Sequence, residues 1–196
     1  MGRASLKNER ITQILDAYEY CLETRGFQGT TLDNVAEHAG LARRMIGHYI
    51  GNREALMTMA VARIVESFNQ KAFSFVDELE STERIQAGLK YLFSEAFNQL
   101  PSTKMVASLL GVSLHDELVR GAIKSIYDSF LLGVDSELAN YIPNAPTESR
   151  RKVAFTIMSL SFGGGWMGNI GFDFSLNNQN LKLAQGLVDE LEKKYL

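Results

Sequence analysis

Apolar side chains recur at intervals of three and four residues along nearly the whole chain, which is the spacing of an α-helix that buries one face. Proline occurs only at Pro101, Pro143 and Pro146, and no segment alternates apolar and polar residues as a half-buried strand does. We therefore expect an all-α protein of about nine helices. Their expected ranges are about 6–25, 32–39, 43–50, 52–79 and 81–99, a short helix after residue 101, then 116–141, 147–170 and 177–196.

The composition is that of an ordinary soluble globular protein, with 196 residues, a formal net charge of −3, 45% hydrophobic residues and 22% charged residues. The single cysteine, Cys21, cannot form an intrachain disulfide, and the N-terminal segment lacks the apolar run of a secretory signal. Residues 153–172 carry no formal charge but include many Gly, Ser, Thr and Asn residues, so we expect a buried helix there and no membrane partner. These features predict a cytoplasmic location.

Several helix ends are marked by residues with the right local chemistry. We expect Gly26 to end the first helix in a left-handed conformation and Thr30, with Asp33, to start the second. Asn52 is expected to cap the fourth helix, because its side-chain oxygen can accept a hydrogen bond from the first turn.

The two short helices expected at 32–39 and 43–50 are separated by Gly40, which can adopt the positive φ that reverses the chain. Together with the preceding helix they have the pattern of a helix-turn-helix, whose last helix enters the major groove of DNA. Residues 39–53 contain Arg43, Arg44 and Arg53 and no acid, in a chain whose net charge is −3. This local excess favours phosphate as a partner. The alternative is a solvated basic face on a helical protein.

Residues 10–56 resemble the DNA-binding domain of TetR/AcrR-family transcriptional regulators. The resemblance rests on the runs GFQGTTL at 26–32, VAEHAGL at 35–41 and HYIGNREAL at 48–56. Within that family, His48 and Tyr49 followed by Gly51 are most similar to the choline-responsive BetI-like subgroup. The resemblance implies a three-helix helix-turn-helix DNA-binding domain at 1–51 and a helical effector-binding and dimerization domain at 52–196.

The function implied by the resemblance is that of a ligand-responsive regulator, expected to be a repressor. Such a protein binds palindromic double-stranded operator DNA as a homodimer and is released by a small-molecule effector. We expect the long fourth helix to act as a lever between the effector pocket and the recognition helix. The alternative is a helical dimeric adaptor that has lost DNA binding.

Carried over residue by residue, the family pattern places base contacts at Arg43, Arg44 and Met45, and phosphate contacts at Thr31, Tyr49 and Arg53. His48 is a further candidate, which either donates to phosphate when protonated or packs as a neutral side chain. The chain departs from the pattern at four positions, since the family usually has Ser or Thr at Ala42, Tyr at Gly47, Phe at Ile50 and Lys at Arg53. The missing hydroxyl cap and the internal glycine predict a weak recognition helix.

The resemblance also implies an effector pocket in the middle helices and a dimer interface formed by the last two. Pocket candidates are aromatic, sulfur-bearing or amide side chains, with Trp166 the strongest and plain core packing the alternative: Phe68, Phe93, Phe97, Met105, Tyr127, Phe130, Phe162, Trp166 and Asn169. Interface candidates are small residues at four-residue steps and an apolar stripe: Ser161, Gly164, Gly165, Gly168, Leu181, Ala184, Leu187, Val188 and Leu191. The alternative for the small residues is close packing inside one subunit.

Enzymatic activity is not expected. The sequence lacks the nucleophile, phosphate-loop and zinc-protease motifs, and its three histidines and single cysteine are not at metal-binding spacing. We therefore expect no catalytic residue, no metal and no cofactor.

Overall fold

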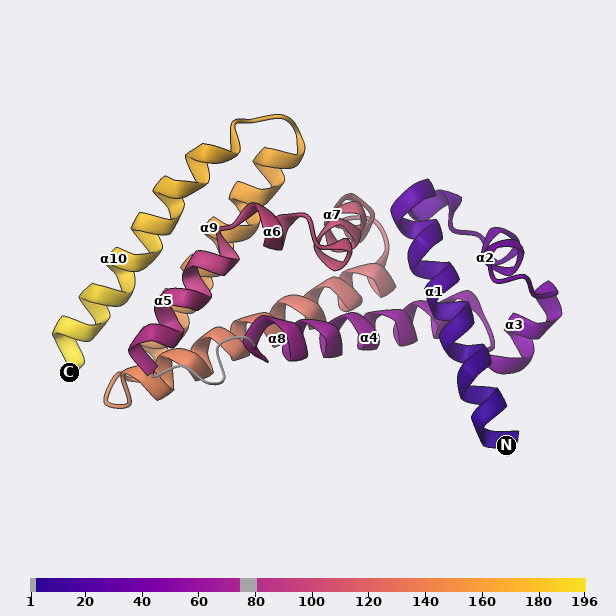
Figure 1. Ribbon diagram of the computed structural model, residues 1–196, viewed down its shortest axis with the longest axis horizontal. Helices are drawn as coiled ribbons and strands as arrows, with labels where there is room; N and C mark the ends of the chain where they lie inside the picture. The colour runs from indigo at the N-terminus through magenta and orange to yellow at the C-terminus, as the bar shows by residue number, and fades with distance from the viewer. Residues whose placement is uncertain (1–2, 75–80) are drawn as a thin grey trace. The chain divides into compact units, whose positions relative to one another are not determined.

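The computed structural model describes residues 3–74 and 81–196, without the side chains of residues 3–5, 64–65, 67–74, 81–82 and 101–102 (Figure 1). In this part of the chain every regular element is helical, which confirms the all-α prediction. The elements are α1 (Arg3–Gly29), α2 (Leu32–His38), α3 (Arg43–Tyr49), α4 (Arg53–Ser74), α5 (Ser81–Leu92), α6 (Glu95–Asn98), α7 (Pro101–Ser113), α8 (Glu117–Tyr141), α9 (Thr147–Asn169), the short 3-10 helix η1 (Phe174–Leu176) and α10 (Asn177–Tyr195).

Two compact units account for the fold. Unit 1 comprises the chain up to Glu66 together with Lys104–Ile126, and unit 2 comprises Ser67–Thr103 and Tyr127–Leu196. These units are defined by packing, whereas the division at residue 51 expected from the sequence is a functional one and stays a prediction.

The core of unit 1 joins the first three helices. Ile14 and Tyr18 of α1, Val35 of α2 and Ile46 of α3 are at most 2% exposed. Figure 1 shows α2 and α3 beside α1 at the indigo and purple end of the chain, where both helices contact it. The three helices therefore enclose one small hydrophobic centre, which fixes the direction in which α3 faces solvent.

The core of unit 2 is built around the last two long helices. α10 returns along α9, and α5 packs against α10 (Figure 1). Ala154 and Ile157 of α9 and Ala184 and Val188 of α10 are completely buried. The Arg84 guanidinium adds a two-pronged ion pair with Glu137, with Nε 2.8 Å from Oε2 and Nη2 2.9 Å from Oε1.

The helix ends confirm some expectations and correct others. Gly26 and Gly40 have φ of 65° and 62°, as expected, although α1 continues past a kink at Gly26 to Gly29. The expected cap at Thr30 is wrong: Thr31 is the N-cap of α2, and the Thr30 hydroxyl donates to the Gly26 carbonyl. Asn52 caps α4 as expected, with Oδ1 accepting from the Ala55 amide at 2.8 Å.

The single helix expected at 81–99 is also wrong. α5 ends at Leu92, and α6 begins after Ser94, whose hydroxyl oxygen accepts from the Phe97 amide at 3.2 Å. The hydroxyl of Ser94 also donates to the Tyr91 carbonyl at 2.7 Å. This serine therefore interrupts the helix by offering the backbone local hydrogen bonds in place of helical ones. The described helices do not include one with the length and hydropathy that a membrane span requires.

Candidate nucleic-acid interface

The helix α3 is anchored by one buried residue and otherwise faces outward. Ile46 is completely buried, whereas Arg44, Gly47 and His48 are exposed and Met45 and Tyr49 are half-buried. Ala42, the N-cap residue, provides no side-chain hydrogen bond to the first turn. The helix is therefore held by its packing more than by its own end, and one whole side of it is open to a partner.

The helix α2 is held by hydrogen bonds at both of its ends. The Thr31 hydroxyl accepts from the Asn34 amide at 3.2 Å, and the Asn34 side chain donates to the Gly29 carbonyl at 2.7 Å. On the other side, Nε2 of Gln13 in α1 donates to the Ala39 carbonyl at 2.6 Å. Thr31 was predicted to contact phosphate, and the structure shows that its oxygen already accepts an internal bond.

Arg43 is paired with an acid of the preceding helix. Its Nη1 donates to Oδ2 of Asp33 at 2.9 Å and to Oδ1 at 3.1 Å, and both side chains remain more than 60% exposed. Arg44, the next residue, is exposed and has no ion pair or hydrogen bond among the described residues. The two arginines therefore differ, although the sequence pattern treats them alike.

Arg53, at the first position of α4, is also engaged within unit 1. Its Nη2 donates to the Phe27 carbonyl at 3.1 Å, and its guanidinium carbon lies 4.4 Å from the centre of the Phe27 ring. The contacts of Arg53 and Asp33 were missed by sequence reasoning, because both depend on how the chain folds back across a turn. A spacing of ten residues between Asp33 and Arg43 carries no helical signal.

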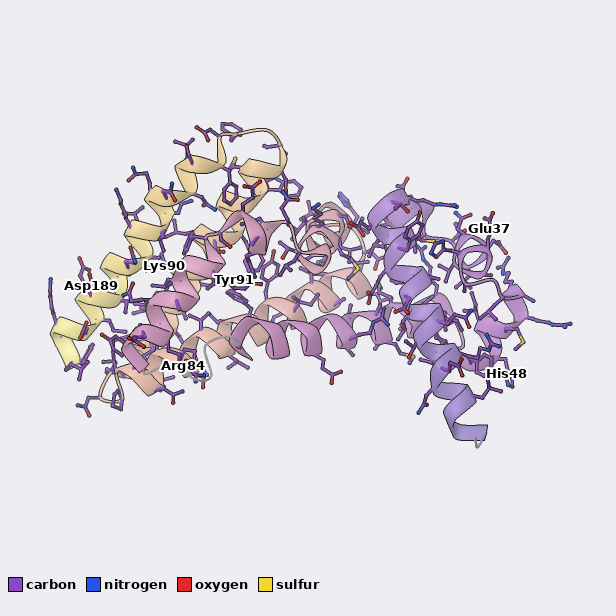
Figure 2. The ribbon with its side chains drawn as sticks, viewed as in Figure 1. Glu37, His48, Arg84, Lys90, Tyr91 and Asp189 are labelled. Carbon is purple, nitrogen blue, oxygen red and sulfur yellow. The ribbon has the colours of Figure 1, made fainter. Side chains whose placement is uncertain are left out.

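Aromatic contacts complete this face of unit 1. The His48 and Tyr49 rings meet edge to face with centroids 5.0 Å apart, and Figure 2 shows His48 on α3. The Tyr20 ring of α1 stacks on His38 of α2, with centroids 3.8 Å apart and planes within 5° of parallel. Among the described residues, no cluster of three or more His, Cys, Asp or Glu side chains is placed to hold a metal ion.

Several effector-pocket candidates gather in one aromatic cluster in unit 2. The Phe162 centroid is 4.8 Å from Tyr127, 5.2 Å from Phe130 and 6.0 Å from Phe97. Phe97 and Phe130 are buried, Phe162 and Tyr127 are half-buried, and burial raises the pKa of the Tyr127 hydroxyl. Tyr91, which sequence reasoning did not single out, joins the cluster with its centroid 5.6 Å from Phe97.

The other pocket candidates lie elsewhere. Trp166 is 42% exposed and Asn169 is exposed, so neither contributes to a buried wall within unit 2. Phe93 is buried in unit 2, Met105 is buried in unit 1, and the side chain of Phe68 lies outside the described residues. Unit 1 contains a pocket of about 590 Å³ that the sequence did not indicate. The residues that line it are Met57, Thr58, Val61, Ala62, Glu117, Leu118, Gly121, Ala122 and Ser125.

The small residues proposed for the dimer interface pack within their own subunit. Ser161 is completely buried and its hydroxyl donates to the Leu92 carbonyl at 2.8 Å. A methyl group added to Gly165 would lie 2.8 Å from Cγ of Asn98, and one added to Gly164 would lie 2.8 Å from Cγ of Asn177. At Gly168 the neighbour is the Phe174 ring. This arrangement matches the alternative of close packing inside one subunit.

The apolar stripe of α10 divides in a similar way. Ala184, Val188 and Leu191 are buried within unit 2, and Leu181 and Leu187 are half-buried. Large apolar side chains that the sequence did not single out are instead exposed on the last helices and their connection: Phe155, Met167, Ile170, Phe172, Leu176 and Leu183.

Comparisons with known proteins agree with this architecture. Residues 14–59 match the family described as bacterial regulatory proteins, tetR family. The HTH-type transcriptional regulator BetI of Burkholderia ambifaria is 22% identical over 195 residues, which cover 97% of this chain and 98% of that protein.

Two solved structures share the fold. Escherichia coli NemR in its reduced form is 19% identical, covers 91% of this chain and 97% of its own, and superposes with a TM-score of 0.77. A transcriptional regulator from Saccharomonospora viridis in complex with choline is 12% identical, covers 93% and 96% of the two chains, and has a TM-score of 0.74. The matched N-terminal domain, the full-length relatives and the shared helical fold show that this chain is a member of the TetR family of DNA-binding transcriptional regulators.

Proposed function

We propose that this regulator is a repressor that binds a palindromic operator as a homodimer in the cytoplasm and is released by a small-molecule effector. The DNA contacts proposed are those of α3 and its flanks, with Arg44 as the main base-reading side chain. On the same helix, Arg43 and Met45 are also proposed to contact bases, and His48 is a further candidate. The proposed phosphate contacts are Thr31, Tyr49 and Arg53.

One observation carries the DNA-binding part of this proposal. Arg44 extends from the exposed side of the second short helix of a helix-turn-helix, with no acid of the described chain paired to it. A guanidinium has a planar set of donors that matches O6 and N7 of guanine in the major groove. A free, exposed arginine at this position is therefore suited to reading a base directly.

The test uses a duplex enriched from a random DNA pool by the full-length protein. Binding is measured by fluorescence anisotropy at two salt concentrations for the wild type, Arg44→Ala and the control Lys182→Ala on α10. Loss of a base contact is expected to cost about 1–3 kcal/mol and to relax specificity at one position. An Arg44→Ala protein that binds all duplexes as the wild type does would contradict this role.

A homodimer is supported by the exposed apolar side chains of unit 2. Phe155, Ile170, Leu176 and Leu183 are each between 58% and 59% exposed. Exposed apolar residues on the last two helices and their connection mark an interaction surface. Analytical ultracentrifugation should give a dimer for the wild type and a shift towards monomer for Phe155→Glu, with Glu148→Gln as an exposed control on the same helix.

The effector is proposed to be a small organic cation held by the aromatic cluster of Tyr127, Phe162, Phe130, Phe97 and Tyr91. The faces of aromatic rings attract cations, and quaternary ammonium groups are bound in this way. Choline is the first ligand to test, because one structural neighbour is described in complex with it. Calorimetry should detect choline binding that Tyr127→Leu weakens. Ala62→Trp fills the pocket of unit 1. If choline binding is weakened by Ala62→Trp as much as by Tyr127→Leu, the ligand lies in the pocket of unit 1 instead.

A further inference from the structure

The pairing of Arg43 with Asp33 uses only one nitrogen of the guanidinium, Nη1. Both carboxylate oxygens of Asp33 accept from Nη1, at 2.9 and 3.1 Å. An arginine has five N–H donors, so Nε and Nη2 are not used by this acid. The edge formed by Nε and Nη2 remains able to make two parallel hydrogen bonds to the O6 and N7 atoms of a guanine.

Two physical effects of Asp33 on DNA binding oppose each other. A carboxylate beside the recognition helix repels phosphate, so its charge alone weakens binding to every duplex. The same carboxylate holds a long, flexible side chain in one orientation before DNA arrives, which removes an ordering cost from binding. The second effect acts only on duplexes that place a guanine at the free edge of Arg43.

We infer that Asp33 is a specificity-determining positioning residue, which holds the Arg43 guanidinium through Nη1 so that its Nε–Nη2 edge reads one guanine of the operator. The inference rests on the proposed DNA-binding function. It makes the two adjacent arginines of α3 unequal, since Arg44 is unsupported by any acid of the described chain whereas Arg43 is oriented by one.

The pair is not needed to hold α2 and α3 together. Asp33 and Arg43 are 65% and 63% exposed, and ion pairs this open to water add little to folding. The two helices already share the buried Val35 and Ile46 side chains. Removing the Asp33 charge should therefore leave the fold intact and change DNA recognition, so that the two roles can be separated experimentally.

The test compares Asp33→Asn with Glu37→Gln, in which an exposed acid on the same helix loses its charge (Figure 2). Each full-length variant is titrated against the duplex enriched by the wild type and against duplexes in which each guanine is replaced in turn. Asp33→Asn is expected to bind the enriched duplex about tenfold more weakly, a fraction of what one bidentate pair provides. Its discrimination should fall at the base pair where Arg43→Ala also loses discrimination.

Two control variants are expected to bind DNA differently from Asp33→Asn. Glu37→Gln should bind all duplexes equally well or slightly more tightly, because it removes negative charge without touching an arginine. Asp33→Glu keeps a carboxylate and should recover part of the discrimination. Thermal unfolding of Asp33→Asn within about 2 °C of the wild type is the expected sign that the fold is intact.

Two other outcomes would overturn the inference. If Asp33→Asn binds every duplex as tightly as the wild type, or more tightly, with unchanged discrimination, Asp33 acts only as a negative charge and the inference is overturned. If the wild type enriches no duplex at all, the proposed function fails, and this inference fails with it.

Discussion

Gly165 offers a sharp test of how α9 is packed. A Cβ at this position would overlap Oδ1 of Asn98 and lie 2.8 Å from its Cγ, and Asn98 is only 3% exposed. In Gly165→Ala the Asn98 side chain must move and lose the bond from its Nδ2 to the Ser94 carbonyl, now 3.0 Å. Overpacking costs about 1–3 kcal/mol and the broken buried hydrogen bond about 1–3 kcal/mol, offset by about 0.5–1 kcal/mol for replacing a helical glycine.

The expected net loss in the free energy of unfolding is about 1–5 kcal/mol, which corresponds to a fall in Tm of about 2–20 °C for a chain of this length. Urea unfolding followed by circular dichroism measures it, at one fixed protein concentration because the stability of the proposed dimer would depend on concentration. The matched control is Gly88→Ala on α5, where a Cβ would meet nothing within 4 Å. That variant should gain about 0.5–1 kcal/mol.

A double-mutant cycle isolates the contact. In the Asn98→Ala background the clashing amide is absent, so Gly165→Ala should cost much less than in the wild type. Close packing of Gly165 against Asn98 is refuted if Gly165→Ala is as stable as Gly88→Ala, or if its cost is the same with and without Asn98. A normal unfolding curve combined with a weakened dimer would instead place Gly165 at the subunit interface.

Three further predictions concern unit 1. Gly47→Ala should raise the free energy of unfolding by about 0.5–1 kcal/mol, because Gly47 is helical and a Cβ there meets nothing within 4 Å. A lower stability of this variant in urea unfolding would contradict the open space around Gly47. Asn52→Ala should lose about 0.5–2 kcal/mol with the cap to the Ala55 amide, whereas Asn52→Asp should lose little; equal losses would mean that the cap is not the cause. Tyr18 is 2% exposed, its hydroxyl has no partner among the described residues, and burial raises its pKa, with Arg53 opposing. The contribution of the neutral Tyr18 side chain to stability is therefore complete below pH 10 and is lost as pH rises through the raised pKa. In urea titrations at pH 7, Tyr18→Phe should unfold at the same urea concentration as the wild type or at a higher one. By pH 11 the variant should have lost less stability than the wild type.

The helical architecture could be predicted from the sequence because its causes are local. Apolar spacing of three and four residues places one face of each helix inward, and positive-φ glycines such as Gly26 and Gly40 mark where the chain turns. The break between α5 and α6 was missed because Ser94 reads as an ordinary helical position. Only the two hydrogen bonds of its hydroxyl, donated to the Tyr91 carbonyl and accepted from the Phe97 amide, show that it ends one helix and caps the next.

The residue types of the DNA-binding face were also visible in the sequence, while their pairing was not. Arg43 and Arg44 look equivalent along the chain, and only the fold brings Asp33 to one of them and leaves the other free. The small residues of α9 show the same limit. Periodicity says that Ser161 and Gly165 allow a close approach, but it does not say which surface approaches.

The amino-acid sequence by itself determined that this chain is helical, that its N-terminal part is a helix-turn-helix, and that the recognition helix is basic, because all three follow from near neighbours along the chain. The tertiary structure decided which arginine is held by an acid, which small residues are buried against Leu92 and Asn98, and which apolar side chains remain exposed. These outcomes depend on contacts between residues distant in sequence, whose geometry is fixed only when the helices pack.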